Sequence, residues 1–458
     1  MSIDFADEVR ARMQRSQRHR LLHGYPMQPL LPRAKSAPEP AWFEASRDRP
    51  LLVGVLPHAS CNPQVRGCGF CTFPHERFEN ARVANVVAHV AHQIEATVRR
   101  EPSLRDRRIG GLYFGGGTAN LTPPAAFARL AHTLTRTFDL EHAEITLEGV
   151  PKYFLIHEQR LLDVVAAMPA RTRRISMGVQ TFDPVWLAKM GRGAFGSRDE
   201  IAEAVSASHA RGFTASGDFL LNLPGRASSG ALGDIDEAIA AEFDQICIYH
   251  LVLAADFDAP WAHDRSLLAR IADNDAAFAA WQEARHHLLA AGYVQTTLTN
   301  FELRPTFFYE NASFDPATWD AVGFGPGAIS TLTNPQMRTA LKWIDEGQSD
   351  AFVRAIERNE SAVAQRFEYD PHDLRIMHLT RNFARLAVDT EAHAAFFGSP
   401  PRHAFGAELA ALEDAGLVVD QGATLALTER GMFFADAVAG TLAAGRVRTR
   451  KPPHGTMG

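Results

Sequence analysis

From residue 50 onward, short runs of apolar and β-branched residues alternate with longer stretches in which apolar residues recur every three or four positions. The short runs predict strands at 51–56, 109–114, 143–148, 173–179, 217–223 and 245–252. The longer stretches predict helices at 82–100, 123–137, 156–168, 197–211, 233–242 and 265–291. Six such units in a row predict a parallel sheet, either open and doubly wound or part of a barrel, because each crossover returns the chain in the same direction.

The flanking regions follow other patterns. Residues 1–49 are rich in Arg, Pro and His and predict an N-terminal arm. The alternation of the 50–305 core fades in a connecting segment, 306–365. Residues 366–445 then read mostly as helices with two short strands around Gly422, which is the outline of a winged-helix-like domain. Its run E-L-A-A-L-E-D-A is acidic where a DNA-reading helix would be basic, which favours a packing or lid domain.

Composition narrows the class of protein. The chain has 458 residues, of which 46% are hydrophobic and 22% charged, as in globular proteins. A net charge of −6 does not suggest a nucleic-acid binder, and we expect the basic tail, 446–458, to be solvated. No apolar run is long enough to span a bilayer, and the N-terminus lacks the order of a signal peptide. We therefore expect a cytoplasmic protein without a membrane partner.

Three of the four cysteines fall in one short stretch, C-N-P-Q-V-R-G-C-G-F-C, as Cys61, Cys68 and Cys71. Such a cluster more often holds metal than forms disulfides. Three thiolates are one short of a structural zinc site, whereas on an iron–sulfur cubane they leave one iron open to a ligand. A zinc site completed by His58 or His75 is the alternative. The fourth cysteine, Cys247, lies in an apolar strand, and we expect it to be buried.

Polar groups and glycines fall at or near the ends of the predicted strands. The second strand ends in a glycine run, Gly115, Gly116 and Gly117, followed by Thr118, which would let a ligand approach the backbone. The third to fifth strands and the segment after the fourth carry Glu148, Ser176, Gln180, Arg192 and Asp218. Because the carboxyl ends of parallel strands share one edge, these groups predict a binding site there.

Several motifs, in this order, make the chain recognisable. They are the cysteine loop, G-G-G-T, L-E-G-V-P, R-I-S-M-G-V-Q-T-F, M-G-R, D-F-L-L-N-L-P-G and G-F-G-P-G-A-I-S. From about residue 50 to 440 the chain resembles the oxygen-independent coproporphyrinogen III oxidase family of radical S-adenosylmethionine (SAM) enzymes. The resemblance implies an α/β fold: a partial (β/α)6 TIM-like barrel with an N-terminal arm and a mostly helical, winged-helix-like C-terminal domain.

The resemblance also implies cofactors and their residues. Cys61, Cys68 and Cys71 would hold a [4Fe-4S] cluster whose open iron is chelated by SAM, and an electron from the cluster would cleave SAM to a 5′-deoxyadenosyl radical. Phe70 would shield the cluster. Gly115 to Thr118 would contact the methionine part of SAM. Glu148, Gln180, Arg192 and Asp218 would lie around SAM. Some relatives bind a second SAM, near positions matched here by Gly325, Gly327, Ala328 and Ile329.

The sequence departs from the family pattern mainly on the substrate side. Six residues separate Cys61 from Cys68 where the family has three, Ala194 replaces a common His, and Q-T-T-L-T-N-F lacks an expected Tyr-Glu pair. These departures predict a small-molecule substrate other than coproporphyrinogen, changed by C-methylation or another carbon-skeleton reaction with two SAM. The alternatives are coproporphyrinogen decarboxylation, haem modification, or a haem-binding chaperone with His58, His75 or His250 as axial ligands. We expect a monomer served by an electron donor such as flavodoxin or ferredoxin.

Overall fold

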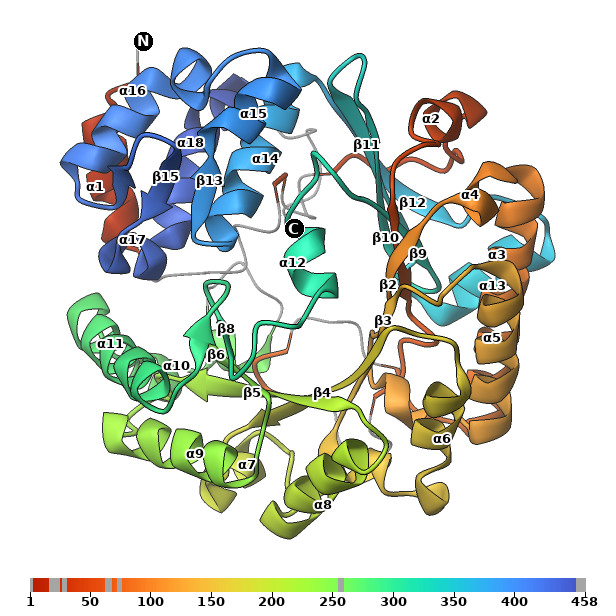
Figure 1. Cartoon of the computed structure of the whole chain (residues 1–458). Coiled ribbons are helices and arrows are strands. Elements are labelled where there is room, and N and C mark those ends of the chain that lie inside the picture. Colours follow the sequence, from red (N-terminus) through yellow and green to blue (C-terminus); the bar gives the residue numbers. More distant parts are fainter. Residues whose placement is uncertain are drawn as a thin grey trace.

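The computed structural model describes residues 3–15, 25–26, 31–61, 68–71, 76–253 and 259–449. The six predicted strands are present as β1 (Leu51–Val55), β2 (Ile109–Phe114), β3 (Glu144–Gly149), β4 (Thr172–Gln180), β5 (Thr214–Leu221) and β6 (Gln245–His250). Each pairs in parallel with the next. Their apolar side chains are buried, because helices cover the outer face of the sheet (Figure 1). The predicted parallel α/β core is confirmed.

The covering helices are α3 (Asn80–Arg100), α4 (Ser103–Asp106), α5 (Pro124–Thr137), α6 (Arg160–Ala167), α7 (Pro184–Lys189), α8 (Arg198–His209) and α9 (Ser228–Ala240). Most of them occur where the three- and four-residue spacing predicts them, whereas the short helices α4 and α7 were not predicted. The prediction of one helix at 265–291 is wrong, because the chain there forms α10 (Arg265–Leu268) and α11 (Asn274–Ala290). The carboxylates of Asp264 and Asp273 accept backbone hydrogen bonds at the two helix starts, so the stretch holds two N-caps.

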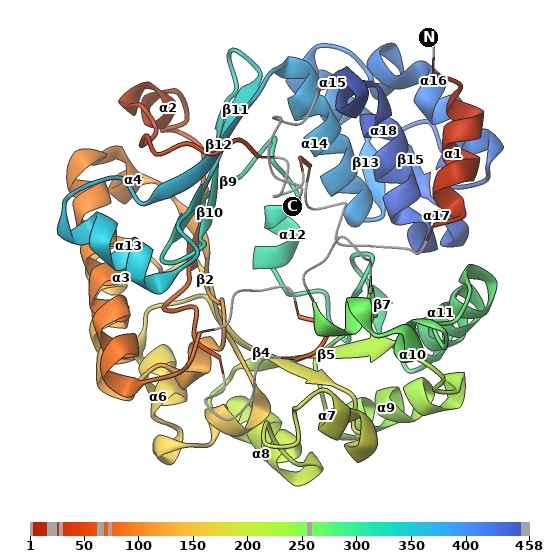
Figure 2. The same cartoon turned by 180° about the vertical axis from the view of Figure 1, so that it is seen from behind.

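The sheet continues beyond residue 305, where the sequence pattern predicted no strands. β9 (Asp320–Phe324) pairs in parallel with β1. The edges are extended by antiparallel strands β10 (Ile329–Asn334), β11 (Thr339–Asp345), β12 (Val363–Tyr369), β8 (Asn300–Glu302) and β7 (Val294–Gln295). The described strands run in the order β12-β11-β10-β9-β1-β2-β3-β4-β5-β6-β8-β7, with no pairing between β12 and β7. This curved, open sheet is the predicted partial barrel (Figures 1 and 2).

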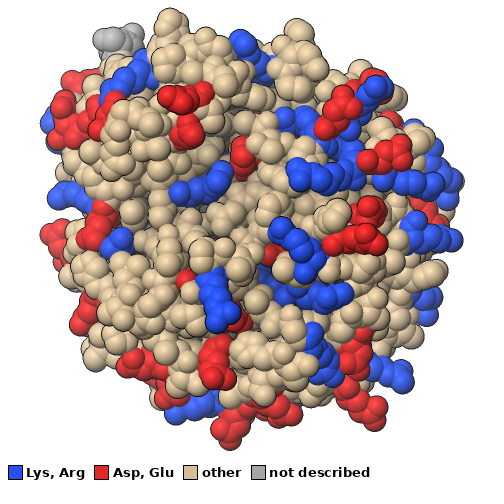
Figure 3. All heavy atoms as spheres, in the orientation of Figure 1, with Lys and Arg blue, Asp and Glu red and all other residues tan. Residues whose placement is uncertain are grey.

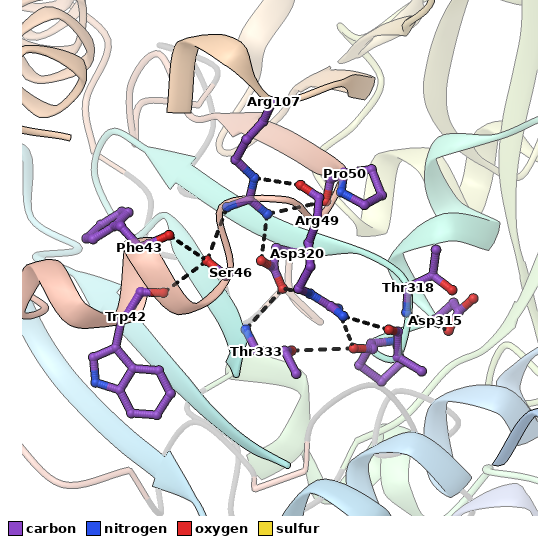
Figure 4. Close-up of polar contacts among 12 residues, drawn as sticks. Trp42, Phe43, Ser46, Arg49, Pro50, Arg107, Asp315, Thr318, Asp320 and Thr333 are labelled. Carbon is purple, nitrogen blue, oxygen red and sulfur yellow. Dashed lines mark hydrogen bonds and ion pairs between the residues drawn. The ribbon is translucent and has the colours of Figure 1, made fainter. Parts of the chain in front are cut away.

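A buried ion-pair cluster holds β1 and β9 together at the start of both strands (Figure 4). The Asp320 carboxylate accepts hydrogen bonds from Arg49 Nε at 2.9 Å and Arg107 Nη2 at 2.6 Å, and from the backbone N–H of Thr333 at 3.0 Å. The side chain of Asp320 is 0% exposed and that of Arg107 1%. Arg49 also donates to the carbonyl of Pro316. The Asp320 carboxylate therefore connects its own strand with the segment around Arg49, about 270 positions earlier in the chain.

The C-terminal region is helical with a small sheet, as predicted. It contains α14 (Pro371–Ala384), β13 (Ala387–Asp389), α15 (Thr390–Phe397), α16 (Pro401–Asp414), β14 (Val418–Asp420), β15 (Thr424–Leu427), α17 (Glu429–Phe433) and α18 (Ala435–Thr449). The small sheet has the order β13-β15-β14, and α16, β14, β15 and α17 form the winged-helix-like unit. Of the predicted tail, residues 450–458 lie outside the described ranges.

The arm and the connecting segment contain short helices. α1 (Phe5–Met13) packs against α16 and α18, so the described start of the arm contacts the C-terminal region (Figure 1). The others are α2 (Pro40–Ala45), α12 (Tyr309–Ser313) and α13 (Ser349–Glu357). Helix α12 lies inside the ring formed by the sheet and the C-terminal region, in both views (Figures 1 and 2). It packs against β1 and β2.

The surface carries charges of both signs. On the face shown in Figure 3, Lys and Arg side chains are interspersed with Asp and Glu side chains, in line with the net charge of −6. No described helix combines the length and the apolar character needed to cross a membrane.

Candidate functional site

A cavity of about 450 Å³ opens at the carboxyl ends of the parallel strands. Most of the predicted site residues line it: Cys61, Cys68, Phe70, Cys71, Gly115, Gly116, Gly117, Thr118, Glu148, Gln180, Arg192, Asp218, Gly327 and Ile329. Its volume falls within the range of small-molecule sites. The structure thus brings together residues that span positions 61 to 329 of the chain.

The three clustered thiols line this cavity, and none of them is in a disulfide. The backbone N–H of Cys71 donates to the carbonyl of Cys68 at 2.9 Å, which makes the C-x-x-C pair a tight turn. Cys61 Sγ lies 3.3 Å from Thr118 Oγ1, and Arg192 Nη1 donates to Cys68 Sγ at 3.2 Å. Among the described residues, no three His, Cys, Asp or Glu side chains form a group that could hold a metal ion. The thiols share a cavity without being gathered into a ligand set.

The glycine run packs β2 against the segment that leads to Cys61. A Cβ on Gly117 would lie 2.4 Å from the carbonyl oxygen of Ser60, closer than real Cβ contacts come. Gly116 has φ +97°, a conformation that favours glycine. A Cβ on Gly115 would lie 2.8 Å from Glu148 Oε2. From the sequence, we predicted that this run lets a ligand approach the backbone. In the structure, its lack of side chains lets the cysteine segment and β3 lie close to the end of β2.

Two carboxyl groups lie on one side of the cavity, on β3 and β5. Burial, followed by the nearby charge of Asp218, raises the pKa of Glu148 to about 7. Tyr113 Oη donates to Glu148 Oε2 at 3.0 Å, and burial raises the pKa of Tyr113 above its usual range. Paired carboxyls in a partly desolvated site favour a cationic ligand, because a cation relieves the repulsion between them.

A guanidinium, that of Arg192 on the segment after α7, also lines the cavity. Arg192 donates to Cys68 Sγ and to the carbonyl of Gly178, and its guanidinium lies 4.5 Å from the ring centre of Phe195. Its Nε is buried and has no hydrogen-bond acceptor among the described residues. Nearby, Gln180 has φ +74°, and the register of β4 with β5 shifts between Gly178 and Gln180. Such backbone strain at the edge of a cavity is common in functional sites.

Tyr309 also lines the cavity, although the sequence analysis did not predict it. It comes from α12, whose start is fixed from the sheet: the Glu144 carboxylate accepts hydrogen bonds from the backbone N–H groups of Phe308 and Tyr309, at 2.7 and 3.1 Å. The rings of Tyr113 and Tyr309 lie 5.1 Å apart. The run F-F-Y-E (307–310) was the only local signal, because its placement depends on a carboxylate from a distant strand.

Three predicted cofactor-binding residues do not line the cavity. Ser176 lies within β4, between Glu148 of β3 and Ser216 of β5. Ala328 is buried, and its carbonyl accepts the N–H of Asp345. Gly325 packs closely against the backbone just after β1, since a Cβ there would lie 2.0 Å from the carbonyl oxygen of Leu56.

The remaining candidates also lie away from the cavity. His58 and His250 are not among its lining residues, and His75 lies outside the described ranges. His58 Nδ1 lies 3.1 Å from the carbonyl oxygen of Ser60, and burial lowers its pKa to about 4. His250 Nδ1 lies 2.9 Å from Asn222 Nδ2. Cys247 is buried in β6, as predicted.

Sequence comparison relates the chain that forms this cavity to known proteins. A family model described as the radical SAM superfamily matches residues 61–228. The heme chaperone HemW of Haemophilus influenzae is 25% identical over 278 residues, which are 59% of this chain and 68% of that protein. The oxygen-independent coproporphyrinogen III oxidase of Bradyrhizobium diazoefficiens is 26% identical over 370 residues, which are 75% of this chain and 78% of that protein.

Structural comparison agrees on the fold. The structure of coproporphyrinogen III oxidase (HemN) from Escherichia coli, a radical SAM enzyme, matches with a TM-score of 0.72 and 18% identity. The match covers 90% of this chain and 94% of that one, so it includes the barrel and the C-terminal region. With the sequence matches and the ordered motifs, it leads to one conclusion. Residues 61–228 match the radical SAM superfamily, and the chain as a whole is similar in sequence and in fold to coproporphyrinogen III oxidase-like proteins.

Proposed function

We propose that this chain holds a [4Fe-4S] cluster through Cys61, Cys68 and Cys71, and binds SAM in the adjoining cavity for radical chemistry on a tetrapyrrole. The observation that carries the proposal is the shared cavity: the thiols of all three cysteines line it together with Glu148 and Arg192. Radical SAM proteins as a family use this cluster and this cosubstrate. When bound, the cluster supplies the electron that cleaves the sulfonium of SAM.

The side chains around the cavity fit a ligand with the charges of SAM. Its carboxylate would suit Arg192, whose buried Nε lacks an acceptor among the described residues. Its amino group and sulfonium would suit the carboxyl groups of Glu148 and Asp218. Three thiolates suit a cluster that keeps one iron open. Gly327 and Ile329 line the same cavity, so a second SAM, if bound, would be a neighbour of the first.

Names of relatives favour a tetrapyrrole over the C-methylation that we predicted from the sequence departures. One relative is named a heme chaperone and the other a coproporphyrinogen III oxidase, and both names refer to tetrapyrroles. We therefore place the tetrapyrrole alternative first. A haem-binding chaperone is the second candidate, favoured by the match to HemW over 59% of this chain.

Anaerobic reconstitution tests the proposal. The protein is loaded with iron and sulfide, then mixed with SAM, a one-electron donor such as flavodoxin or ferredoxin, and either coproporphyrinogen III or haem. We expect 5′-deoxyadenosine to form at a rate that increases with the tetrapyrrole. Haem binding, seen as a shifted Soret band, without SAM cleavage would support the chaperone. A protein that neither cleaves SAM nor binds a tetrapyrrole would contradict both candidates.

The raised pKa of Glu148 predicts how SAM binding depends on pH. A carboxyl group with a pKa of about 7 is mostly neutral at pH 6 and mostly ionised at pH 8. Because the ionised form attracts the positive charges of SAM, the Kd for SAM should fall as pH rises from 6 to 8. In Glu148→Gln we expect a Kd roughly tenfold higher at pH 8 and a weaker dependence on pH. Equilibrium dialysis of reconstituted protein measures both.

A matched control for this pH series is Glu141→Gln, since Glu141 is an exposed carboxylate just before β3. This variant should keep the wild-type Kd at each pH. If Glu148→Gln binds SAM with the wild-type affinity and pH dependence, Glu148 does not contact the ligand.

A further inference from the structure

A second cavity of about 260 Å³ lies on the outer side of the sheet. Its walls come from α2, α3, β9, β11 and the segment that follows α13, and include Phe43, Gln93, Trp343 and Asp345. Gly323 of β9 lines both this cavity and the cysteine-lined one. The two cavities are therefore separated at this point by little more than one strand.

A buried carboxyl group lines this outer cavity without a cationic partner among the described residues. Asp345 is 3% exposed, and Gln93 Nε2 donates to its Oδ2 at 2.6 Å. Gln93 is the one side chain among the described residues that donates to this carboxyl, and no Lys, Arg or His of the described residues forms an ion pair with it. Burial raises the pKa of Asp345 to about 7. Buried carboxylates are normally paired with a positive charge, so this one is suited to receive a cation from a ligand.

Aromatic rings beside the carboxyl add to this character. Phe43 is 2% exposed and Trp343 6%, and their ring centres lie 6.2 Å apart, edge to face. Both rings line the cavity with Asp345. An indole ring attracts an organic cation through its face, and a carboxylate adds charge and direction. This combination favours an ammonium group carried on a small apolar scaffold.

A hydrogen-bond chain connects Asp345 to the wall of the first cavity. Gln93 Oε1 accepts the backbone N–H of Gly325 at 2.9 Å, so the amide nitrogen of Gln93 must face Asp345. The segment that starts at Gly325 continues to Gly327 and Ile329, which line the cysteine-lined cavity. One side chain, that of Gln93, therefore connects the Asp345 carboxyl with the backbone of Gly325.

We propose that the outer cavity binds a small primary ammonium ligand at Asp345, and that binding stiffens the Gly325–Ile329 segment through Gln93. The family comparisons assign nothing to this cavity. The proposal does not depend on the cluster or on SAM.

Calorimetric titration of the full chain tests the binding. Benzylamine is the cationic probe, and benzyl alcohol is its neutral counterpart of similar shape. We expect benzylamine to bind at least tenfold more tightly than benzyl alcohol, and Asp345→Asn to weaken benzylamine binding at least tenfold. Asp350→Asn is the matched control, because Asp350 is an exposed carboxylate, 64% accessible, on α13, and should leave the affinity unchanged. Equal binding of the two probes, or unchanged binding by Asp345→Asn, would overturn the site.

Hydrogen exchange of the same protein tests the connection. Saturating benzylamine should slow exchange in the peptide that contains the Gly325 amide severalfold. The variant Gln93→Met keeps the size of the side chain and removes both hydrogen bonds, so it should bind benzylamine without slowing this exchange. Wild-type protein that binds benzylamine with no change at Gly325 would overturn the connection.

Discussion

Cys68→Ser should leave the chain without iron or sulfide after anaerobic reconstitution, whereas wild-type protein should carry about four of each per chain. Two thiolates are too few to hold a cubane with one open iron, and a serine hydroxyl is a poor ligand for iron in such a cluster. Cys61→Ser and Cys71→Ser should behave in the same way, because all three thiols line one cavity. Iron and sulfide analysis, with the visible absorption of the cluster, measures the loss.

The chain supplies its own control in Cys247. This thiol is buried in β6, 3.6 Å from Ser216 Oγ and 3.5 Å from Gln245 Oε1, and burial raises its pKa. Cys247→Ser should therefore keep the full content of iron. If wild-type protein prepared without oxygen contains one zinc and no iron, or if Cys68→Ser retains its iron, the proposed cluster is wrong.

Asp320→Asn should lower the free energy of unfolding by about 3–5 kcal/mol, the cost of leaving a buried charge without its partner. Asp320 is the carboxylate shared by Arg49 and Arg107, and its side chain is 0% exposed. The change leaves two buried guanidinium groups facing a neutral amide at the junction of β1 and β9. Urea unfolding followed by circular dichroism measures the difference.

Asp48→Asn is the control for this stability measurement. Asp48 also faces an arginine, Arg47, but its side chain is 94% exposed and the ion pair is long, at 3.7 Å. Exposed pairs contribute about 0–1 kcal/mol, so this variant should unfold almost as wild type does. A loss below about 1 kcal/mol in Asp320→Asn would show that the buried cluster contributes little to stability.

The parallel core was predictable because its strands are apolar runs of ordinary length with helices between them. The strands beyond residue 305 were not, for a physical reason. β10 is rich in hydroxyl side chains, and Ser330 and Thr333 are almost fully buried with hydrogen bonds to the backbone of neighbouring segments. A polar strand whose partners are distant in sequence looks like a loop when the sequence is read alone. The parallel pairing of β9 with β1 was not predictable either, because no local sequence pattern links two strands so far apart in the chain.

The cavity was partly predictable for a related reason. Residues such as Glu148 and Asp218 lie at or near strand ends, and parallel strands bring those ends together. Tyr309 could not be found in this way, because it reaches the cavity from a short helix that Glu144 holds in place. The role of Gly117 was also hidden, since its need for glycine comes from the Ser60 carbonyl against which it packs.

The pairing of β1 with β9 determines when, during translation, β1 can gain both of its neighbouring strands. β1 is synthesised before any other strand of the sheet, yet one of its two neighbours is the segment Asp320–Phe324. Ribosomes add about 5–20 residues per second, so β1 waits on the order of tens of seconds with one edge unpaired. The pocket next to the cysteines also needs Ile329 to be complete. The complete pocket can therefore exist only after nearly three quarters of the polypeptide has been translated, as the position of Ile329 in the 458-residue chain shows.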